Sequence, residues 1–319
     1  MKHMGVEGNR EASGYENRVP SEIQEQQLLV DTDWGNEWKR KQRARKHADS
    51  PERWDKRAPS FGSVRGSSSY VSQFIESLRL EPGETVFDMG CGNGAIAVPL
   101  ALAGFDVTAR DFSAGMLSAL RAGAEEAGVA DRIHSAQLSW EDDWTAKGLR
   151  PNSVDVAFAS RSVITNDLAA ALAKLTWIAR RRCCVTVSMG YTPKMSPTIL
   201  RELGVGGVRT YDQLYAFNIL YQQGQCPELR YIVHDRTFHF NTVERARDYI
   251  SDLLEHAKTY CDSDELDSAR RRLGPWIEAR MEPNEKAGEV NHHGEVEGMY
   301  KIVMPNDVRW ACLTWEVNK

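Results

Sequence analysis

Residues 85–95 read TVFDMGCGNGA, an apolar run that leads into three glycines. The run has the length and composition of a buried β-strand, and the glycines at 90, 92 and 94 permit tight backbone turns. Helical spacing follows in AIAVPLALAG at 95–104. A helix N-terminus placed directly after such a loop presents free N–H groups to a ligand. The stretch therefore predicts a strand–loop–helix unit with a binding site at the loop.

Short apolar segments alternate with helical segments beyond this unit. Strands are expected at 106–110, 132–137, 154–160 and 183–189, and helices at 114–128 and 167–181. This alternation is typical of an α/β protein with a doubly wound, mostly parallel sheet and helices on both faces. Further strands are expected at 230–240, 300–304 and 309–317, with helices at 242–257 and 264–281.

The chain divides into four expected parts. Residues 1–49 form a helical N-terminal extension that is partly loose, and residues 50–190 form the ligand-binding domain. Residues 191–229 form a helical insertion after the fifth strand, which we interpret as a lid. Residues 230–319 are expected to complete the sheet. The insertion is too long for a bare connection inside a compact domain.

Two acids indicate what the glycine loop binds. The loop GCGNGA also fits the fingerprint of dinucleotide-binding proteins, so the glycines alone leave both ligands open. Asp88 stands two residues before the first glycine, where its charge would repel a pyrophosphate and attract an ammonium group. Asp111 ends the next strand, where a carboxylate can accept both hydroxyls of a ribose. A ligand with a cation and a ribose but no phosphate is S-adenosylmethionine.

The stretch VFDMGCGNGAIAVPLALAGFDVTARDFSAGML resembles the cofactor-binding half of class I S-adenosylmethionine-dependent methyltransferases of the small-molecule subgroup. The resemblance extends more weakly over residues 50–190, and it implies a Rossmann-like methyltransferase fold with a seven-stranded sheet. It implies S-adenosyl-L-methionine as cofactor and S-adenosyl-L-homocysteine as product. By position, the cofactor-binding residues implied are Phe61, Asp88, Gly90, Cys91, Gly92, Gly94, Asp111, Phe112, Met116, Ser139, Trp140 and Ser160.

Some of these positions carry alternatives. Family members often have Asp where this chain has Ser139, and Glu141 or Asp142 is the expected substitute for its contact with adenine. Phe112, Met116 and Trp140 are equally compatible with plain core packing. Phe61 is the aromatic residue expected to close over the cofactor.

The methyl acceptor is expected at the carboxyl end of the fourth strand, where the sequence is SRSV at 160–163. Base-methylating enzymes carry a D/N-P-P-aromatic tetrad there, and its absence argues against a nucleic-acid substrate. Arg161 is the candidate anchor for an anionic acceptor, with a structural ion pair to Asp167 or another acid as the alternative. Tyr191 and Tyr215 are candidate acceptor contacts in the lid. We assign no catalytic base, because alignment does most of the work in methyl transfer.

The composition narrows the function classes. The chain has 319 residues, 41% of them hydrophobic, and its net charge of −5 argues against a general nucleic-acid binder. We find no run long enough to span a membrane and no spacing that suits a metal site, and we expect a cytoplasmic protein. Two rival functions remain open. One is an NAD(P)-dependent oxidoreductase, and the other is a non-catalytic protein that binds RNA or protein through its basic tract at 39–47.

Overall fold

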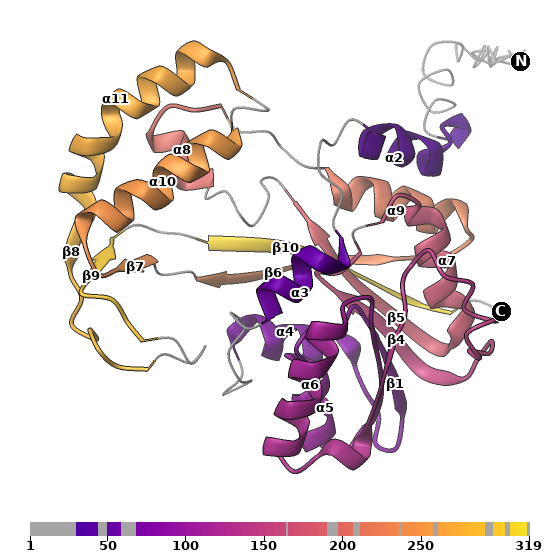
Figure 1. The fold of residues 1–319 in the computed structure, drawn as a ribbon. Helices are drawn as coiled ribbons and strands as arrows, with labels where there is room; N and C mark the ends of the chain where they lie inside the picture. Colours follow the sequence, from indigo (N-terminus) through magenta and orange to yellow (C-terminus); the bar gives the residue numbers. More distant parts are fainter. Residues whose placement is uncertain are drawn as a thin grey trace, which may run out of the picture.

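The computed structural model describes residues 30–43, 50–58, 68–163, 165–189, 197–206, 211–235, 238–257, 261–290, 296–303 and 307–317. Its centre is a seven-stranded sheet of order β3-β2-β1-β4-β5-β10-β6 (Figure 1). Neighbouring strands are parallel from β3 to β5, whereas β10 is antiparallel to both β5 and β6. The predicted mostly parallel seven-stranded sheet is confirmed. Its strands are β1 Thr85–Met89, β2 Asp106–Asp111, β3 Ile133–Gln137, β4 Val154–Ser160, β5 Ala179–Ser188, β6 Glu228–Asp235 and β10 Asp307–Glu316.

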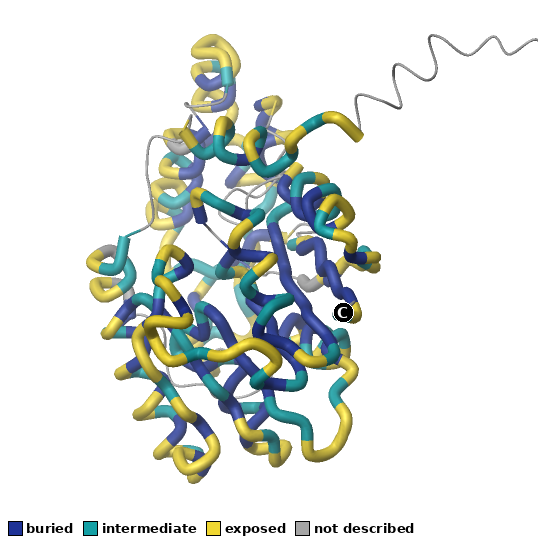
Figure 2. The backbone as a smooth tube through the Cα atoms, turned by 90° about the vertical axis from the view of Figure 1, so that its right-hand side faces the viewer, coloured by how far each residue is buried: buried dark blue, intermediate teal, exposed yellow. Residues whose placement is uncertain are grey.

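Helices cover both faces of this sheet, and its strands are the most buried part of the chain (Figure 2). One face packs against α4, α5 and α6 through residues such as Phe74, Leu100 and Leu120. The other packs against α7, α9 and the N-terminal helix α2 through Leu172, Ile219 and Trp38. These helices are α2 Trp34–Arg43, α4 Ser69–Leu78, α5 Ala97–Leu102, α6 Ala114–Glu126, α7 Leu168–Ile178 and α9 Asp212–Gln222. The short helix α3, Pro51–Arg57, contacts α6.

A second set of elements has its own small core. A three-stranded sheet of order β7-β9-β8 lies with α8, α10 and α11 at one side of the molecule (Figure 1). Hence β6 and β10 join the main sheet, but residues 238–302 do not, in contrast to the expectation for residues 230–319. The predicted strand at 230–240 is two strands in two different sheets. The bounds are α8 Pro197–Glu202, β7 Phe238–Phe240, α10 Val243–Ala257, α11 Ser263–Arg280, β8 Met281–Pro283 and β9 Tyr300–Ile302.

The predicted insertion at 191–229 is divided between the two sets. Helix α8 contributes Ile199 and Leu200 to the small core, whereas α9 packs on the main sheet. A lid function for this segment stays a prediction.

None of the described helices is long and apolar enough to cross a bilayer.

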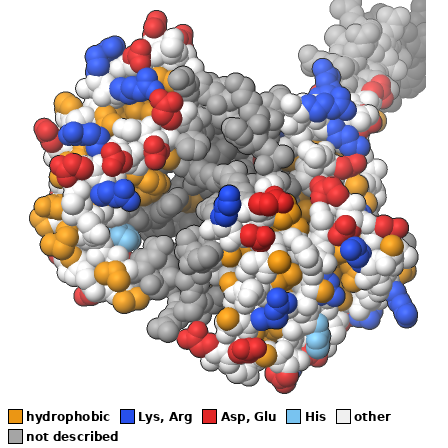
Figure 3. Space-filling view, viewed as in Figure 1, with side chains coloured by type: hydrophobic (Ala, Val, Ile, Leu, Met, Phe, Trp, Pro, Cys, Tyr) orange, Lys and Arg blue, Asp and Glu red, His pale blue; other side chains and the backbone are white. Residues whose placement is uncertain are grey.

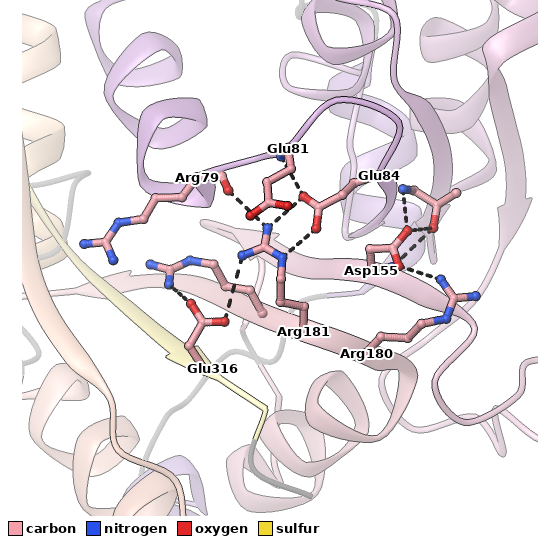
Figure 4. A network of polar contacts seen from close by, with 9 residues as sticks. Arg79, Glu81, Glu84, Asp155, Arg180, Arg181 and Glu316 are labelled. Carbon is pink, nitrogen blue, oxygen red and sulfur yellow. Dashed lines mark hydrogen bonds and ion pairs between the residues drawn. The ribbon is translucent and has the colours of Figure 1, made fainter.

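Strand β5 begins four residues earlier than predicted, because its first arginines are held in the extended conformation by acids. Arg180 Nη1 lies 2.7 Å from Asp155 Oδ1, and Arg181 makes two hydrogen bonds of 2.5 and 2.7 Å to Glu84 (Figure 4). Arg182 pairs with Glu316 from the antiparallel strand β10. These charges lie at the amino ends of β1, β4 and β5, opposite the edge that carries the glycine loop.

Candidate functional site

The glycine loop leaves the carboxyl end of β1 and turns into α5. The backbone N–H groups of Gly90 and Cys91 both donate to the carbonyl of Arg110, at 2.7 and 3.0 Å, which ties the loop to β2. Gly90, Gly92 and Gly94 all have positive φ values, of 75°, 54° and 88°. L-residues rarely adopt this left-handed region, so the predicted need for glycine is confirmed at all three positions.

The space beside each glycine separates structural from ligand-facing positions. A Cβ on Gly90 would lie 2.3 Å from Ser162 Cβ, and one on Gly94 would lie 3.1 Å from Leu120 Cγ. At Gly92 no atom lies within 4 Å of the added Cβ. Gly90 and Gly94 are therefore required by packing, whereas Gly92 borders open space.

Asp88, the residue before the last of β1, has a buried carboxyl group. It is 1% exposed, and its Oδ2 has no hydrogen-bond partner in the structure. Burial, and then the nearby carboxylate of Asp111, raise the pKa of Asp88 well above its ordinary value. Burial, and then the carboxylates of Asp88 and Asp111, raise the pKa of the Cys91 thiol well above its ordinary value, so the thiol stays protonated at neutral pH.

Asp111 links the loop to the helix that follows β2. Its Oδ2 accepts from the N–H of Gly92 and its Oδ1 from the N–H of Ser113, both at 2.9 Å. Burial raises the pKa of Asp111, and these backbone donors oppose the rise. The N–H of Phe112 also hydrogen-bonds to this carboxylate, and a carboxylate has about four acceptor sites, so Asp111 can still accept a hydroxyl group.

The predicted adenine side begins with Phe112 and Met116, which differ from ordinary core residues. Met116 is 3% exposed and Phe112 is half-buried, and neither belongs to the described hydrophobic clusters. Beside them, Asp55 of α3 accepts hydrogen bonds from Ser113 Oγ at 2.5 Å and from Gly115 N–H at 2.9 Å. These bonds lower the pKa of Asp55. They fix α3 against the N-terminus of α6.

Ser139 and Trp140 follow β3 as predicted, and their contacts differ. Trp140 packs in the core against Trp144, with 5.6 Å between ring centroids, and its Nε1 donates to the carbonyl of Ser162 at 3.0 Å. Its described contacts are thus structural. Ser139 Oγ lies 2.5 Å from Glu141 Oε2, and Thr165 Oγ1 donates to Glu141 Oε1 at 3.1 Å. Both candidate acids stand beside Ser139, since Asp142 Oδ2 accepts from the N–H of Ser139 at 2.9 Å, and a contact of either acid with adenine stays a prediction.

The carboxyl end of β4 carries Ser160 and Arg161. Ser160 Oγ lies 2.8 Å from the hydroxyl of Tyr70, which also lies 2.8 Å from Thr186 Oγ1. The backbone of Arg161 is left-handed, with φ of 57°, and its N–H donates to Thr186 Oγ1 at 2.9 Å. The guanidinium lies over the ring of Tyr70, with Cζ 4.1 Å from the centroid. The ion pair with Asp167 that we considered for Arg161 is not present, since Asp167 pairs with Lys39 at 2.7 Å.

Three predicted residues fall elsewhere. Phe61 and Tyr191 lie outside the described residues. Tyr215 lies on α9, with its ring 5.9 Å from Trp34 and 5.8 Å from Trp38 of α2. Its described ring contacts join two helices, and an acceptor contact by Tyr215 stays a prediction.

Sequence reasoning missed Asp55, Tyr70 and Thr186. Tyr70 begins α4, and the helical spacing of Val71, Phe74 and Leu78 marks only its buried face. No local pattern indicates that its hydroxyl meets β4 and β5.

An open surface hollow is lined by residues 141–145 and by Ala173, Lys174 and Trp177, and no residue of the glycine loop lines it.

The comparisons with known proteins agree with this geometry. Residues 86–181 match a family model described as a methyltransferase domain. A Haemophilus influenzae protein described only as uncharacterized is 32% identical over 184 residues, which cover 57% of this chain and 66% of that protein. This chain thus spans just under two thirds of that relative's length.

Solved structures similar to the chain share little sequence with it. The YcgJ protein from Bacillus subtilis is 11% identical with a TM-score of 0.48, covering 78% of this chain and 98% of that one. Geranyl diphosphate C-methyltransferase from Streptomyces coelicolor is 12% identical with a TM-score of 0.42, covering 78% and 77%. Nothing about the acceptor of this chain follows from such distant likenesses. The matched region, residues 86–181, contains β1, β2, β3 and β4 with the glycine loop, Asp88 and Asp111. Residues 86–181 of this chain therefore match a methyltransferase domain, and they lie within the seven-stranded sheet.

Proposed function

We propose that this protein transfers a methyl group from S-adenosylmethionine to a small-molecule acceptor. The observation that carries the proposal is Asp88, a buried carboxyl group with an unpartnered oxygen at the end of β1. Such an atom is costly unless a ligand supplies a donor. The ammonium group of a methionine moiety supplies one, together with a compensating charge. A dinucleotide pyrophosphate would instead meet a repelling carboxylate.

Other residues of the loop fit the same ligand. The open space at Gly92 allows a ligand to approach the backbone, and Asp111 offers free lone pairs to ribose hydroxyls. Phe112 and Met116 provide apolar surface for adenine, and Ser139 with Glu141 provides polar groups for its edge. When bound, S-adenosylmethionine supplies a methyl group on a cationic sulfur, which an acceptor atom displaces.

The chain's own contribution to the reaction is alignment and exclusion of water. Ser160 and Arg161 stand at the end of β4, beside the glycine loop, and are positioned by Tyr70 and Thr186. Burial raises the pKa of Tyr70 to about 12, so its hydroxyl is a neutral positioning group and no general base at physiological pH. Holding an acceptor in line with the methyl group supplies most of the rate enhancement for such a displacement.

A direct test compares three ligands by isothermal titration calorimetry on the full chain. S-adenosylmethionine and S-adenosylhomocysteine are expected to bind, and NADH is not. Binding of NADH without binding of S-adenosylmethionine would establish the oxidoreductase alternative. Each member of a panel of small amines, alcohols and acids would then be incubated with the protein and S-adenosylmethionine. The compounds that cause S-adenosylhomocysteine to form would identify the acceptor class.

A further inference from the structure

The two residues that follow β4 face different environments. Ser162 faces the glycine loop, since its Oγ donates to the carbonyl of Met89 at 2.6 Å and its Cβ lies against Gly90. Arg161, one residue earlier, faces α4, β5 and β10 instead, through Thr186 and Tyr70. Arg161 thus adjoins in sequence a residue that contacts the glycine loop, while its own guanidinium lies over Tyr70.

The guanidinium of Arg161 lies on an aromatic platform and has no ion pair with an acid among the described residues. It stacks on Tyr70 and lies 5.9 Å from the ring centroid of Trp310 on β10. The three consecutive arginines that begin β5 all pair with acids.

Trp310 supplies a second, independent observation. It is 8% exposed, and its Nε1 has no hydrogen-bond partner in the structure. Five other indole N–H groups in the described part of the chain donate to carbonyl, carboxylate or hydroxyl oxygens, namely those of Trp38, Trp140, Trp144, Trp276 and Trp315. A buried, unpartnered N–H donor calls for an acceptor atom.

We propose that Arg161 and Trp310 bind an oxyanion, a carboxylate or phosphate group, of the methyl acceptor. Both groups offer only donors, and the guanidinium fork matches the two oxygens of such a group. The nearest aromatic hydroxyl, that of Tyr70, is neutral and already hydrogen-bonded to Ser160 and Thr186, so it adds no competing charge. This inference rests on the proposed function, because it places the anion beside the methyl-transfer site.

The test uses the full chain saturated with S-adenosylhomocysteine, so that the cofactor site is filled before any anion is added. Inorganic phosphate and acetate are titrated at constant ionic strength by calorimetry and by tryptophan fluorescence, with chloride as the reference salt. We expect saturable binding of one or both anions, and the stronger of the two identifies the acceptor's acid group. Arg161→Met should weaken that binding about tenfold or more, the scale of lost hydrogen bonds to a charged group. Trp310→Phe keeps an aromatic ring and should weaken it about threefold to tenfold.

Arg150→Met is the matched control. Arg150 is an exposed arginine just before the amino end of β4, so its loss removes the same charge far from the proposed site. The anion affinity of the Arg150→Met variant should equal that of the wild type. Equal anion affinity in the wild type and Arg161→Met, with S-adenosylhomocysteine still bound, would overturn this inference and leave the proposed function intact. Failure of S-adenosylhomocysteine and S-adenosylmethionine to bind the wild type would instead overturn the proposed function. If Trp310→Phe fails to fold, Arg161→Lys replaces it, since an ammonium group cannot reproduce the planar fork and should also bind the anion more weakly.

Discussion

Replacing Asp88 by Asn should have opposite effects on stability and on ligand binding. The buried Oδ2 of Asp88 has no partner, and burial raises the pKa of the group well above its ordinary value. A folded state with a raised carboxyl pKa binds more protons than the unfolded state, so its free energy of unfolding falls as pH rises toward that pKa. The loss is absent below the ordinary value for Asp, about 3.9, and complete above the raised pKa. Asn cannot ionise, so the Asp88→Asn variant does not lose this free energy of unfolding as pH rises.

The expected magnitude follows from the unsatisfied buried group, whose cost is about 1–3 kcal/mol. The ligand-free Asp88→Asn variant should therefore gain stability over the wild type as pH rises, up to about that amount. Its affinity for S-adenosylmethionine should fall by about 1.5–3 kcal/mol, because a charged hydrogen bond to the ammonium group is lost. Urea unfolding of the free protein from pH 5 to 8.5 measures the first effect, and calorimetric titration measures the second.

Asp155→Asn is the matched control on the same sheet. Asp155 accepts from Thr85 and Arg180, and these bonds lower its pKa despite partial burial. Its replacement should lower stability at neutral pH and leave cofactor affinity unchanged. A stability difference between Asp88→Asn and wild type that does not vary with pH would refute the reasoning about the buried charge. Unchanged affinity would remove Asp88 from the cofactor site.

Three further substitutions test the site. Gly92→Val should abolish binding of S-adenosylmethionine in calorimetry, because the valine side chain fills the open space beside the loop. The control is Gly128→Val, since Gly128 has a comparable positive φ and equally open surroundings, and this variant should bind the cofactor normally. Asp111→Ala should weaken binding by about 1.5–3 kcal/mol and should erase any preference for S-adenosylhomocysteine over its 2′-deoxy analogue; a retained preference would argue against a ribose contact. Trp38→Phe removes a 2.9 Å hydrogen bond to the carbonyl of Thr165 and should lower the free energy of urea unfolding by about 0.5–1.5 kcal/mol, and no change would mean that this bond adds nothing.

The glycine loop and the strands around it could be predicted because their signals are local. The positive φ values at Gly90, Gly92 and Gly94 follow from a strand that must turn at once into a helix. The strands β1 and β4 are short and mostly apolar, and the predicted bounds of β4, 154–160, are confirmed residue for residue. Asp88 lies within β1, and Asp111 was placed at the end of the strand predicted at 106–110.

Other features depend on contacts between distant segments, which no local pattern encodes. Tyr70 meets Thr186 across 116 residues. The extended conformation of Arg181 depends on Glu84. The separate core around β7, β8 and β9 arises because residues 238–302 bury their apolar side chains against one another and against α8. Tyr215 is a candidate acceptor contact because it lies in an aromatic segment after the fifth strand, and its packing against two tryptophans of α2 could not be read from that position.

Helix α2 bears on the proposal that the basic tract at 39–47 binds RNA or another protein. Lys39 pairs with Asp167, Arg40 with Glu37, and Lys41 with the buried Asp212. Over the visible face of the molecule, basic side chains lie among acidic ones (Figure 3).

The first half of the tract is therefore engaged within the chain, where it fixes α2 to α7 and α9. Trp38 extends this docking to the segment after β4, since it holds the carbonyl of Thr165, whose hydroxyl donates to Glu141 beside Ser139. A helix that partners its own charges internally and supports the proposed adenine side is better explained as part of the methyltransferase than as a separate binding arm.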